Sequence, residues 1–225
     1  MWNPPVSSSE TADRRLGIVG AGKVGTTIAR AAIAAGYDVA ISGSGPAERI
    51  ELIVDVLAPG ARAVTTAEVV SHADLIVMAV PMHRFRELPQ DLFAGKILVD
   101  AMNYWEDIDG IDEELATAPM GTSIVVQRHF ASARLVKSLN HLGYFELEEG
   151  RRPRGAPGRI ALAAAGDDRA AVAAVMQLID RLGFDAVDAG PLEAGLALGP
   201  DGPVFGVAHS AAELSELLWA EASSA

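Results

Sequence analysis

Short apolar runs alternate along the chain with longer stretches whose apolar residues recur at helical spacing. The short runs predict strands at residues 16–19, 38–42, 63–65, 74–80, 96–101, 134–139, 160–165 and 184–187. The stretches between and after them predict helices at residues 23–35, 46–57, 68–71, 85–93, 122–130, 168–182 and 211–222. Residues 107–119 are acidic and residues 150–158 are rich in Gly, Pro and Arg, so both segments are expected to be irregular.

This order of elements predicts the fold class. Strands that alternate with helices indicate an α/β fold with a mostly parallel, doubly wound sheet of the Rossmann type. The run 74–80 is apolar throughout, which is typical of a strand covered on both faces. We expect a disordered tail over residues 1–14, a dinucleotide-binding domain over 15–130 and a small C-terminal extension over 131–225.

Composition narrows the function classes. The chain has 225 residues, half of them hydrophobic, and a formal charge of −12, which disfavours nonspecific binding to nucleic acid or to an anionic membrane. It has no cysteine, which excludes disulfides and a thiol nucleophile, and no His, Asp and Glu pattern suggests a metal site. The longest apolar run, 75–82, is far shorter than the roughly 20 residues of a membrane helix. The N-terminus lacks a secretory signal pattern, so we expect a cytoplasmic protein.

A glycine motif follows the first predicted strand. In a GxGxxG pattern the first glycine permits a tight turn, the second leaves room for a pyrophosphate, and the third lets helix and strand approach. The free amides at the start of the next helix would hold the phosphates. The residues expected at this site are Gly20, Ala21, Gly22, Lys23, Val24 and Gly25. A glycine turn without a ligand is the alternative.

The second predicted strand ends without the acidic residue that usually binds the ribose hydroxyls of NAD. Ser42, Gly43 and Ser44 stand there instead. Hydroxyls and glycine amides favour a 2′-phosphate, and Arg49 could add a positive charge, so NADP is expected rather than NAD. Alternatively, Ser44 only caps a helix and Arg49 is solvated.

Three further segments should face the cofactor, because ligands of doubly wound folds lie at the carboxyl ends of the strands. They are residues 80–83, 102–105 and 140–144. Nothing in them resembles a hydrolase triad. No catalytic residue is assigned, and the candidates are Asn103, Asn140 and His141. The two asparagines are favoured, because a neutral amide can orient a nicotinamide carboxamide; His83 and His141 are expected to be surface loop histidines.

The chain resembles the NADPH-dependent reductases of the deazaflavin coenzyme F420, a family of dinucleotide-binding enzymes. The resemblance runs from about Leu16 to Gly206. Among the motifs that carry it are GIVGAGKVG and LIVMAVP, which many oxidoreductases share, and LVDAMNYW and AAAGDD. The specific ones are RLVKSLNHLGY (134–144) and GFDAVDAGPL (183–192).

The resemblance implies direct hydride transfer between C4 of nicotinamide and C5 of F420, with the C-terminal extension closing the cleft. Such chemistry needs no nucleophile. It also implies roles in NADP binding for the glycine loop, for Ser42 and Ser44, for Ala79, Val80 and Pro81 along the dinucleotide, and for Asn103 and Asn140 beside the nicotinamide. The turn at 188–192 would lie across the cleft.

The sequence departs from the family pattern at one point. Members often have Ser-Arg after the second strand, and the Arg binds the 2′-phosphate. This chain has Ser44-Gly45-Pro46 there, so Arg49 becomes the candidate for that role. The loop arginines at 151, 152, 154 and 159 could hold the anionic tail of F420, or could pair with the glutamates at 146, 148 and 149.

Two other functions stay open. One is an NADP-dependent reductase of a small imine or carbonyl compound, which needs a proton donor such as His83, Tyr104 or His141. The other is a nonenzymatic NADP-binding redox sensor. A homodimer is expected by analogy alone.

Overall fold

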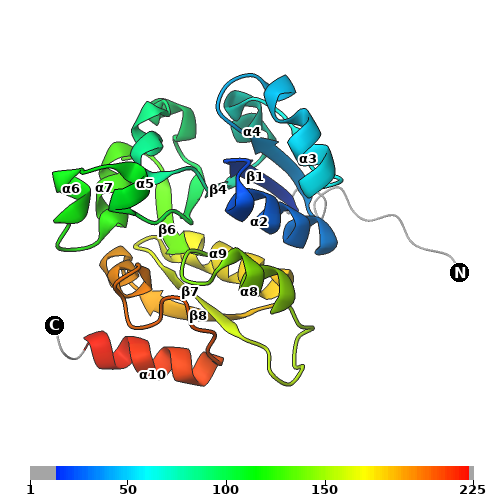
Figure 1. The fold of residues 1–225 in the computed structure, drawn as a ribbon. Coiled ribbons are helices and arrows are strands. Elements are labelled where there is room, and N and C mark those ends of the chain that lie inside the picture. The colour runs from blue at the N-terminus through cyan, green and yellow to red at the C-terminus, as the bar shows by residue number, and fades with distance from the viewer. Residues whose placement is uncertain (1–13, 223–225) are drawn as a thin grey trace, which may run out of the picture.

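The structure is a computed structural model that describes residues 14–222, so the expected tail over 1–14 lies almost entirely outside it. One sheet with the strand order β3-β2-β1-β4-β5-β6-β7-β8 forms its centre (Figure 1). The strands are β1 (Arg15–Val19), β2 (Asp38–Ser42), β3 (Arg62–Ala63), β4 (Leu75–Met78), β5 (Ile97–Asp100), β6 (Arg134–Ser138), β7 (Ala161–Ala165) and β8 (Asp185–Gly190). The first six run parallel, and β7 and β8 run in the opposite direction. The expected Rossmann-type fold class is confirmed.

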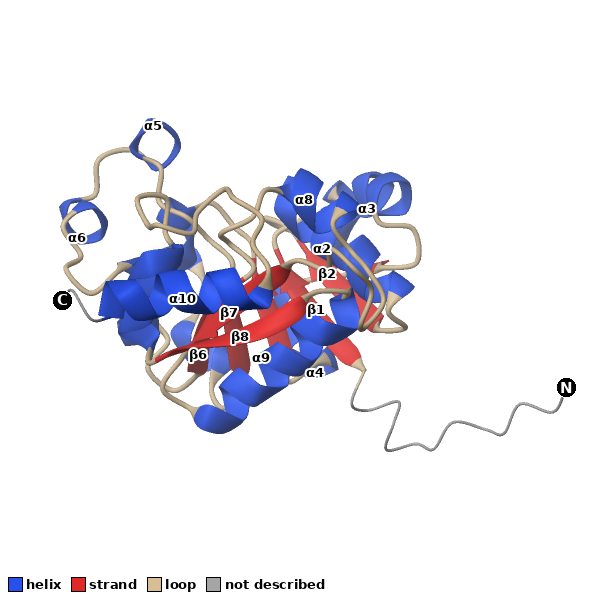
Figure 2. Ribbon diagram, turned by 90° about the horizontal axis from the view of Figure 1, so that it is seen from below, coloured by secondary structure: helices blue, strands red, loops and turns tan. Residues whose placement is uncertain are grey.

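Helices cover both faces of this sheet (Figure 2). They are α2 (Lys23–Ala34), α3 (Glu51–Leu57), α4 (Thr66–His72), α5 (Glu106–Asp109), α6 (Glu113–Ala116), α7 (Thr122–His129), α8 (Tyr144–Glu149), α9 (Arg169–Leu182) and α10 (Ala211–Ala222). The 3₁₀ helices are η1 (Ala47–Arg49), η2 (Met82–Glu87), η3 (Gln90–Phe93) and η4 (Leu192–Leu198). Within residues 14–222, no helix combines the length and the apolar character needed to cross a membrane.

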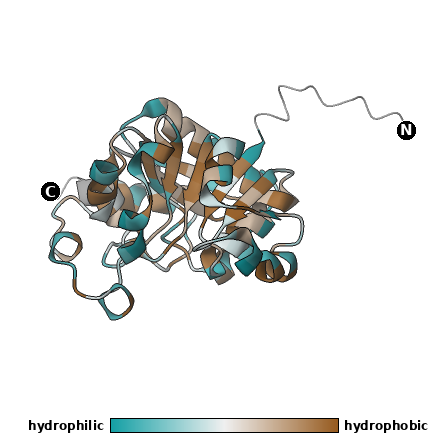
Figure 3. Ribbon diagram, turned by 90° about the horizontal axis from the view of Figure 1, so that it is seen from above, coloured by the Kyte–Doolittle hydropathy of each residue, from teal (hydrophilic) through white to brown (hydrophobic). Residues whose placement is uncertain are grey.

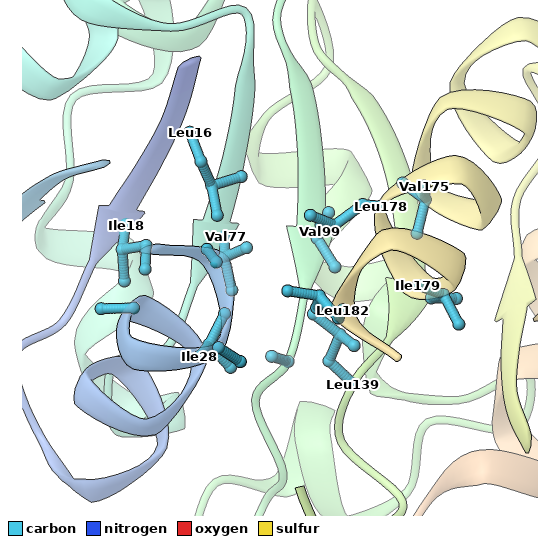
Figure 4. Close-up of a cluster of buried hydrophobic side chains, with 14 of the residues drawn as sticks. Leu16, Ile18, Ile28, Val77, Val99, Leu139, Val175, Leu178, Ile179 and Leu182 are labelled. Atoms are coloured by element: carbon cyan, nitrogen blue, oxygen red, sulfur yellow. The ribbon is translucent and has the colours of Figure 1, made fainter. Parts of the chain in front are cut away.

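Alternation along the strands produces two cores. Residues such as Ile18, Val77 and Val99 face α2 and α9 and form the first core, shown in Figure 4. Their neighbours, such as Met78 and Leu98, face the opposite way and pack with α4 and α7. The strands are therefore apolar on both sides, as the brown centre of Figure 3 shows. Each fully buried Leu, Ile or Val contributes about 1.5–3 kcal/mol.

The extension shares this sheet. β7 pairs with β6, while η4 and α10 form a third core with β7 and β8. Because the sheet is continuous from β5 to β8, the division of the chain at residue 130 stays a prediction.

Several expected elements differ in detail. The helix expected at 46–57 is divided into η1 and α3, and that expected at 85–93 is replaced by the 3₁₀ turns η2 and η3, which Pro89 separates. The segment 107–119 contains α5 and α6. α8 and η4 were not expected at all. α7 begins after Gly121, at φ +86°, and no side chain caps it.

Candidate functional site

The glycine loop has the geometry that the motif predicts. Gly20 has φ +122°, and a Cβ there would lie 2.3 Å from the carbonyl oxygen of Ala79. A Cβ on Gly25 would lie 1.8 Å from the carbonyl oxygen of Gly20. A Cβ on Gly22 would meet nothing within 4 Å. The outer two glycines are thus required by the protein's own packing, while the space beside Gly22 is open.

Helix α2 begins at this open position. Gly22 is its N-cap, no side chain caps it, and its first turn holds no acidic residue. The first amides of α2 are therefore free to bind an anion, and the positive end of the helix dipole favours one. A pyrophosphate fits these features. Beside it, Lys23 is exposed with its ammonium 5.4 Å from the Tyr144 ring centre, and Ala21 and Val24 pack against the first core.

A cavity of about 440 Å³ extends from the loop along the carboxyl ends of β1, β2 and β4. Of the residues predicted for the site, Gly20, Ala21, Gly22, Ser44, Ala79, Val80 and Pro81 line it. Sequence reasoning missed further lining residues, among them Thr66, Arg84, Glu87 and Leu88. Arg84 and Glu87 form an ion pair with an N–O distance of 2.8 Å, which lowers the pKa of Glu87 and raises that of Arg84. Their spacing on the turn after β4 is the signal that could have identified them.

The end of β2 separates the two serines. Ser42 is fully buried, and its hydroxyl lies 3.1 Å from that of Thr66, so it does not line the cavity. Ser44 is exposed on the cavity wall. The guanidinium of Arg49 lies over Gly45, 3.4 Å from where a Cβ would stand. Ser44 and Arg49 are therefore close to the cavity, whereas Ser42 supports its wall.

Asn103 and Asn140 form a reciprocal pair. The side-chain amide of Asn103 donates to the Asn140 carbonyl at 2.9 Å, and that of Asn140 donates to Asn103 Oδ1 at 3.0 Å. Leu139, at φ +62°, turns the chain so that Asn140 points inward. Asn140 is 4% exposed, and among residues 14–222 nothing donates to its Oδ1. An unpartnered buried acceptor suits the N–H₂ group of a carboxamide.

The two loop histidines differ. His83 is exposed and bonded to Asp109 at 2.8 Å, as expected of a surface residue. The expectation that His141 is also a surface residue is wrong, because it is only 1% exposed. Burial lowers its pKa to about 3, assisted by the charges of Lys137 and His209. His141 is therefore neutral, and its Nε2 accepts a bond from the amide of Ala163 at 3.3 Å.

Sequence reasoning missed a buried charged cluster between β5 and β6. Lys137 is 2% exposed and donates to the Met102 carbonyl, and its Nζ lies 3.4 Å from Asp100 Oδ2. Asp100 also accepts bonds from the Ser123 hydroxyl at 2.7 Å and the Met102 amide at 3.0 Å. Burial lowers the pKa of Lys137, and the Asp100 carboxylate opposes part of that shift. A lysine inside an apolar strand was the available signal.

Tyr104 and Trp105 follow β5 at the same edge of the sheet. The Tyr104 hydroxyl donates to the Gly110 carbonyl at 2.8 Å and accepts from the Asp112 amide at 3.1 Å. Trp105 is 43% exposed and packs edge-on against Phe205. Both residues line a cavity at this edge of the sheet.

The arginine-rich loop lies away from these groups. Arg154 and Arg159 pair with Asp180, and Arg159 also pairs with Asp185. The expected pairing with neighbouring glutamates is wrong, since Glu148 instead pairs with Arg30 of α2. Arg151 and Arg152 bond to backbone carbonyls and line a small cavity at the C-terminal end of α2, about 18 Å from the glycine loop by helix rise.

The turn at 188–192 is also placed differently from the expectation. Its residues Asp188 to Pro191 line a cavity between β8 and α10, separate from the one at the glycine loop. Within residues 14–222, no group of three or more His, Asp or Glu side chains could hold a metal ion.

Comparison with known proteins agrees with this geometry. Residues 15–104 match the family described as NADP oxidoreductase coenzyme F420-dependent. This part of the chain is similar to that family. The match covers the glycine loop, β1 to β5 and Asn103, and it includes all the residues that line the 440 Å³ cavity.

Solved structures extend the similarity over most of the chain. A hypothetical protein from Sinorhizobium meliloti is 25% identical with a TM-score of 0.73, over 87% of this chain and 95% of that one. A protein from Arthrobacter sp. FB24, whose naming as an F420-dependent NADP-reductase is itself a prediction, is 27% identical with a TM-score of 0.66, over 79% and 84%.

An imine reductase from Pseudomonas sp. is 17% identical with a TM-score of 0.53, over 79% of this chain and 56% of that one, and shows the shared fold alone. No curated protein matches the chain.

Proposed function

We propose that this protein is an F420-dependent NADP oxidoreductase, which transfers a hydride between NADP(H) and coenzyme F420. The observation that carries the proposal is the open space beside Gly22 at the uncapped start of α2. It supports a diphosphate held by main-chain amides, with the rest of the dinucleotide in the 440 Å³ cavity.

The residues of the chain have distinct roles in this proposal. The first turn of α2 binds the pyrophosphate, and Ala79 to Pro81 line its path. Ser44 and Arg49 receive the 2′-phosphate, since no free carboxylate stands at the end of β2 to repel it. Asn140 Oδ1 accepts from the carboxamide and thereby fixes the orientation of the nicotinamide ring. When bound, NADPH supplies a hydride at C4 of that ring.

The experiment mixes the full-length protein with NADPH and oxidised F420 and follows the absorbance of both cofactors. We expect NADPH and F420 to be consumed in equal amounts. Turnover with a cyclic imine but not with F420 would favour the second candidate, an imine or carbonyl reductase. Binding of NADPH without turnover of either acceptor would favour the third candidate, a nonenzymatic NADP-binding redox sensor. The homodimer and the cytoplasmic location stay predictions.

A further inference from the structure

A second cavity lies at the carboxyl ends of β5 and β6. Its volume is about 360 Å³, which is within the range of small-molecule sites. Its walls come from the Tyr104–Trp105 segment, from α6 and the start of α7, and from η4 with the residues after it. Tyr104, Trp105, Leu115 and Leu196 give it an apolar lining, and Lys137 is its buried cation.

Lys137 is held so that part of its ammonium group stays available. A Cβ at Gly195 would lie 2.9 Å from Lys137 Cβ, so the missing side chain in η4 leaves room for the lysine stem. Of the three N–H groups of the Lys137 ammonium, one points to the Met102 carbonyl and one to Asp100. Within residues 14–222 no bond is recorded for the third, and the cavity adjoins Lys137.

This cavity lies at the same edge of the sheet as the dinucleotide cavity. Val80 and Pro81 follow β4 and line the dinucleotide cavity, and β6 is two strands away, or about 10 Å. Three consecutive residues after β5 lie between these strands. The Met102 carbonyl accepts a bond from Lys137, the Asn103 side chain donates to the Asn140 carbonyl, and Tyr104 lines the second cavity. A molecule in the second cavity would lie on the β6 side of the dinucleotide.

The other candidate proton donors are unsuitable. His141 is neutral and buried, and His83 is exposed and paired with Asp109. The hydroxyl hydrogen of Tyr104 is used in the bond to the Gly110 carbonyl. Lys137 is the ionisable donor that combines burial with a place on the cavity wall.

We propose that the second cavity binds the hydride acceptor and that the Lys137 ammonium protonates the acceptor's nitrogen or oxygen as the hydride arrives. This rests on the proposed function. The acceptor is a conjugated C=N or C=O compound, which includes the deazaflavin ring. A C–H bond forms with the hydride from the reduced nicotinamide, and the electron pair moves to the heteroatom. That atom takes a proton from Nζ, leaving a neutral amine that water reprotonates.

The surroundings of Lys137 support this step. Its lowered pKa favours proton release, and Asp100 accepts hydrogen bonds from the Met102 amide and the Ser123 hydroxyl. The other charged or titratable groups facing the cluster are Glu106 and Asp201 on the cavity wall and His141 beneath it.

The first test compares Lys137→Met with a Lys137→Met/Asp100→Asn double variant, which removes both charges and so avoids leaving a buried carboxylate unpaired. Lys96→Met, in an exposed pair with Asp74, is the control. Steady-state rates are measured with F420 and with 2-methyl-1-pyrroline, and NADPH affinity by titration. We expect kcat to fall about a hundredfold or more, NADPH affinity to stay within twofold, and the alkaline limb of the pH–rate profile to disappear.

Unchanged kcat in folded Lys137 variants would overturn the inference and leave the proposed function intact. A wild-type protein that turns over neither acceptor would instead count against the proposed function.

The second test does not depend on turnover. Besides Lys137 the sequence contains only Lys23 and Lys96, so ¹³Cε-labelled lysine signals can be assigned by the substitutions. We expect NADP⁺ to shift Lys23, and F420 added to the NADP⁺ complex to shift Lys137 but not Lys96. If F420 saturates the complex without moving the Lys137 signal, the acceptor does not lie beside this lysine and the inference is wrong.

Discussion

The two halves of the sheet use different means to build a site. The half around β1, β2 and β4 relies on the main chain, with three glycines, free amides and an uncapped helix. The half around β5 and β6 relies on buried polar side chains from distant segments, namely Lys137, Asp100, Ser123 and the Asn103–Asn140 pair. A main-chain site is encoded by local sequence, whereas a side-chain site depends on how segments meet in the fold.

The largest expected effect concerns the glycine loop. In Gly22→Ala the new methyl group meets no protein atom, so stability should be unchanged, but it occupies the space for the pyrophosphate. We expect NADPH affinity to fall on the order of a hundredfold, or about 2.7 kcal/mol, by isothermal titration calorimetry.

Gly25→Ala is the matched variant. Its methyl group would lie 1.8 Å from the Gly20 carbonyl oxygen, so we expect a loss of about 3 kcal/mol in stability and a Tm lower by roughly 6–12 °C. If Gly22→Ala binds NADPH with unchanged affinity, the glycine loop is not part of the NADPH-binding site.

His141, in the half of the sheet around β5 and β6, should make the stability of the protein depend on pH. Its pKa is about 3 in the folded protein and near 6.5 when unfolded, so the unfolded chain binds more protons below pH 6.5 and stability falls as the pH is lowered. When the pH is lowered from 7.5 to 5.5, this histidine should lower the free energy of unfolding by about 1.4 kcal/mol. His141→Gln keeps an acceptor for the Ala163 amide. Urea unfolding at the two pH values should show that the free energy of unfolding falls by about 1.4 kcal/mol less in this variant than in the wild type. Parallel pH curves for both proteins would mean that His141 titrates normally.

The preference for NADPH over NADH tests whether the residues at the end of β2 bind the 2′-phosphate. Ser44→Asp places a carboxylate on the cavity wall, where it should repel the 2′-phosphate and bind ribose hydroxyls. We expect the ratio of kcat/KM for NADPH over NADH to fall about tenfold, which is about 1.4 kcal/mol. The same ratio in variant and wild type would show that the 2′-phosphate binds elsewhere.

The smallest effect is expected in the arginine loop. The Arg154 side chain is 81% exposed, and Arg159 still holds Asp180 without it, so Arg154→Ala should change stability by less than about 1 kcal/mol. The KM for F420 should stay within twofold, because this loop lies at the far end of α2. A tenfold rise in KM would restore the loop as a binding site for the tail.

The sequence predicted the fold class well because its strands are apolar on both faces and its glycine motif is local. It did not predict α8 or η4, because their formation depends on packing against α2 and β6. It placed His141 on the surface, since nothing local shows that Leu139 adopts a positive φ and turns the following residues inward. It overlooked Lys137, whose neutralising partner lies 37 positions earlier along the chain, in another strand.

The reversed direction of β7 and β8 determines which segment of the chain reaches Lys137. β8 ends beside Ala165, itself level with Lys137, and η4 then crosses the sheet face to the lysine. One contiguous stretch, 192–201, thus supplies the wall opposite Tyr104 and Trp105. If the proposed function holds, exchanging that stretch between relatives would change which compound is reduced and leave the nucleotide cavity unaltered.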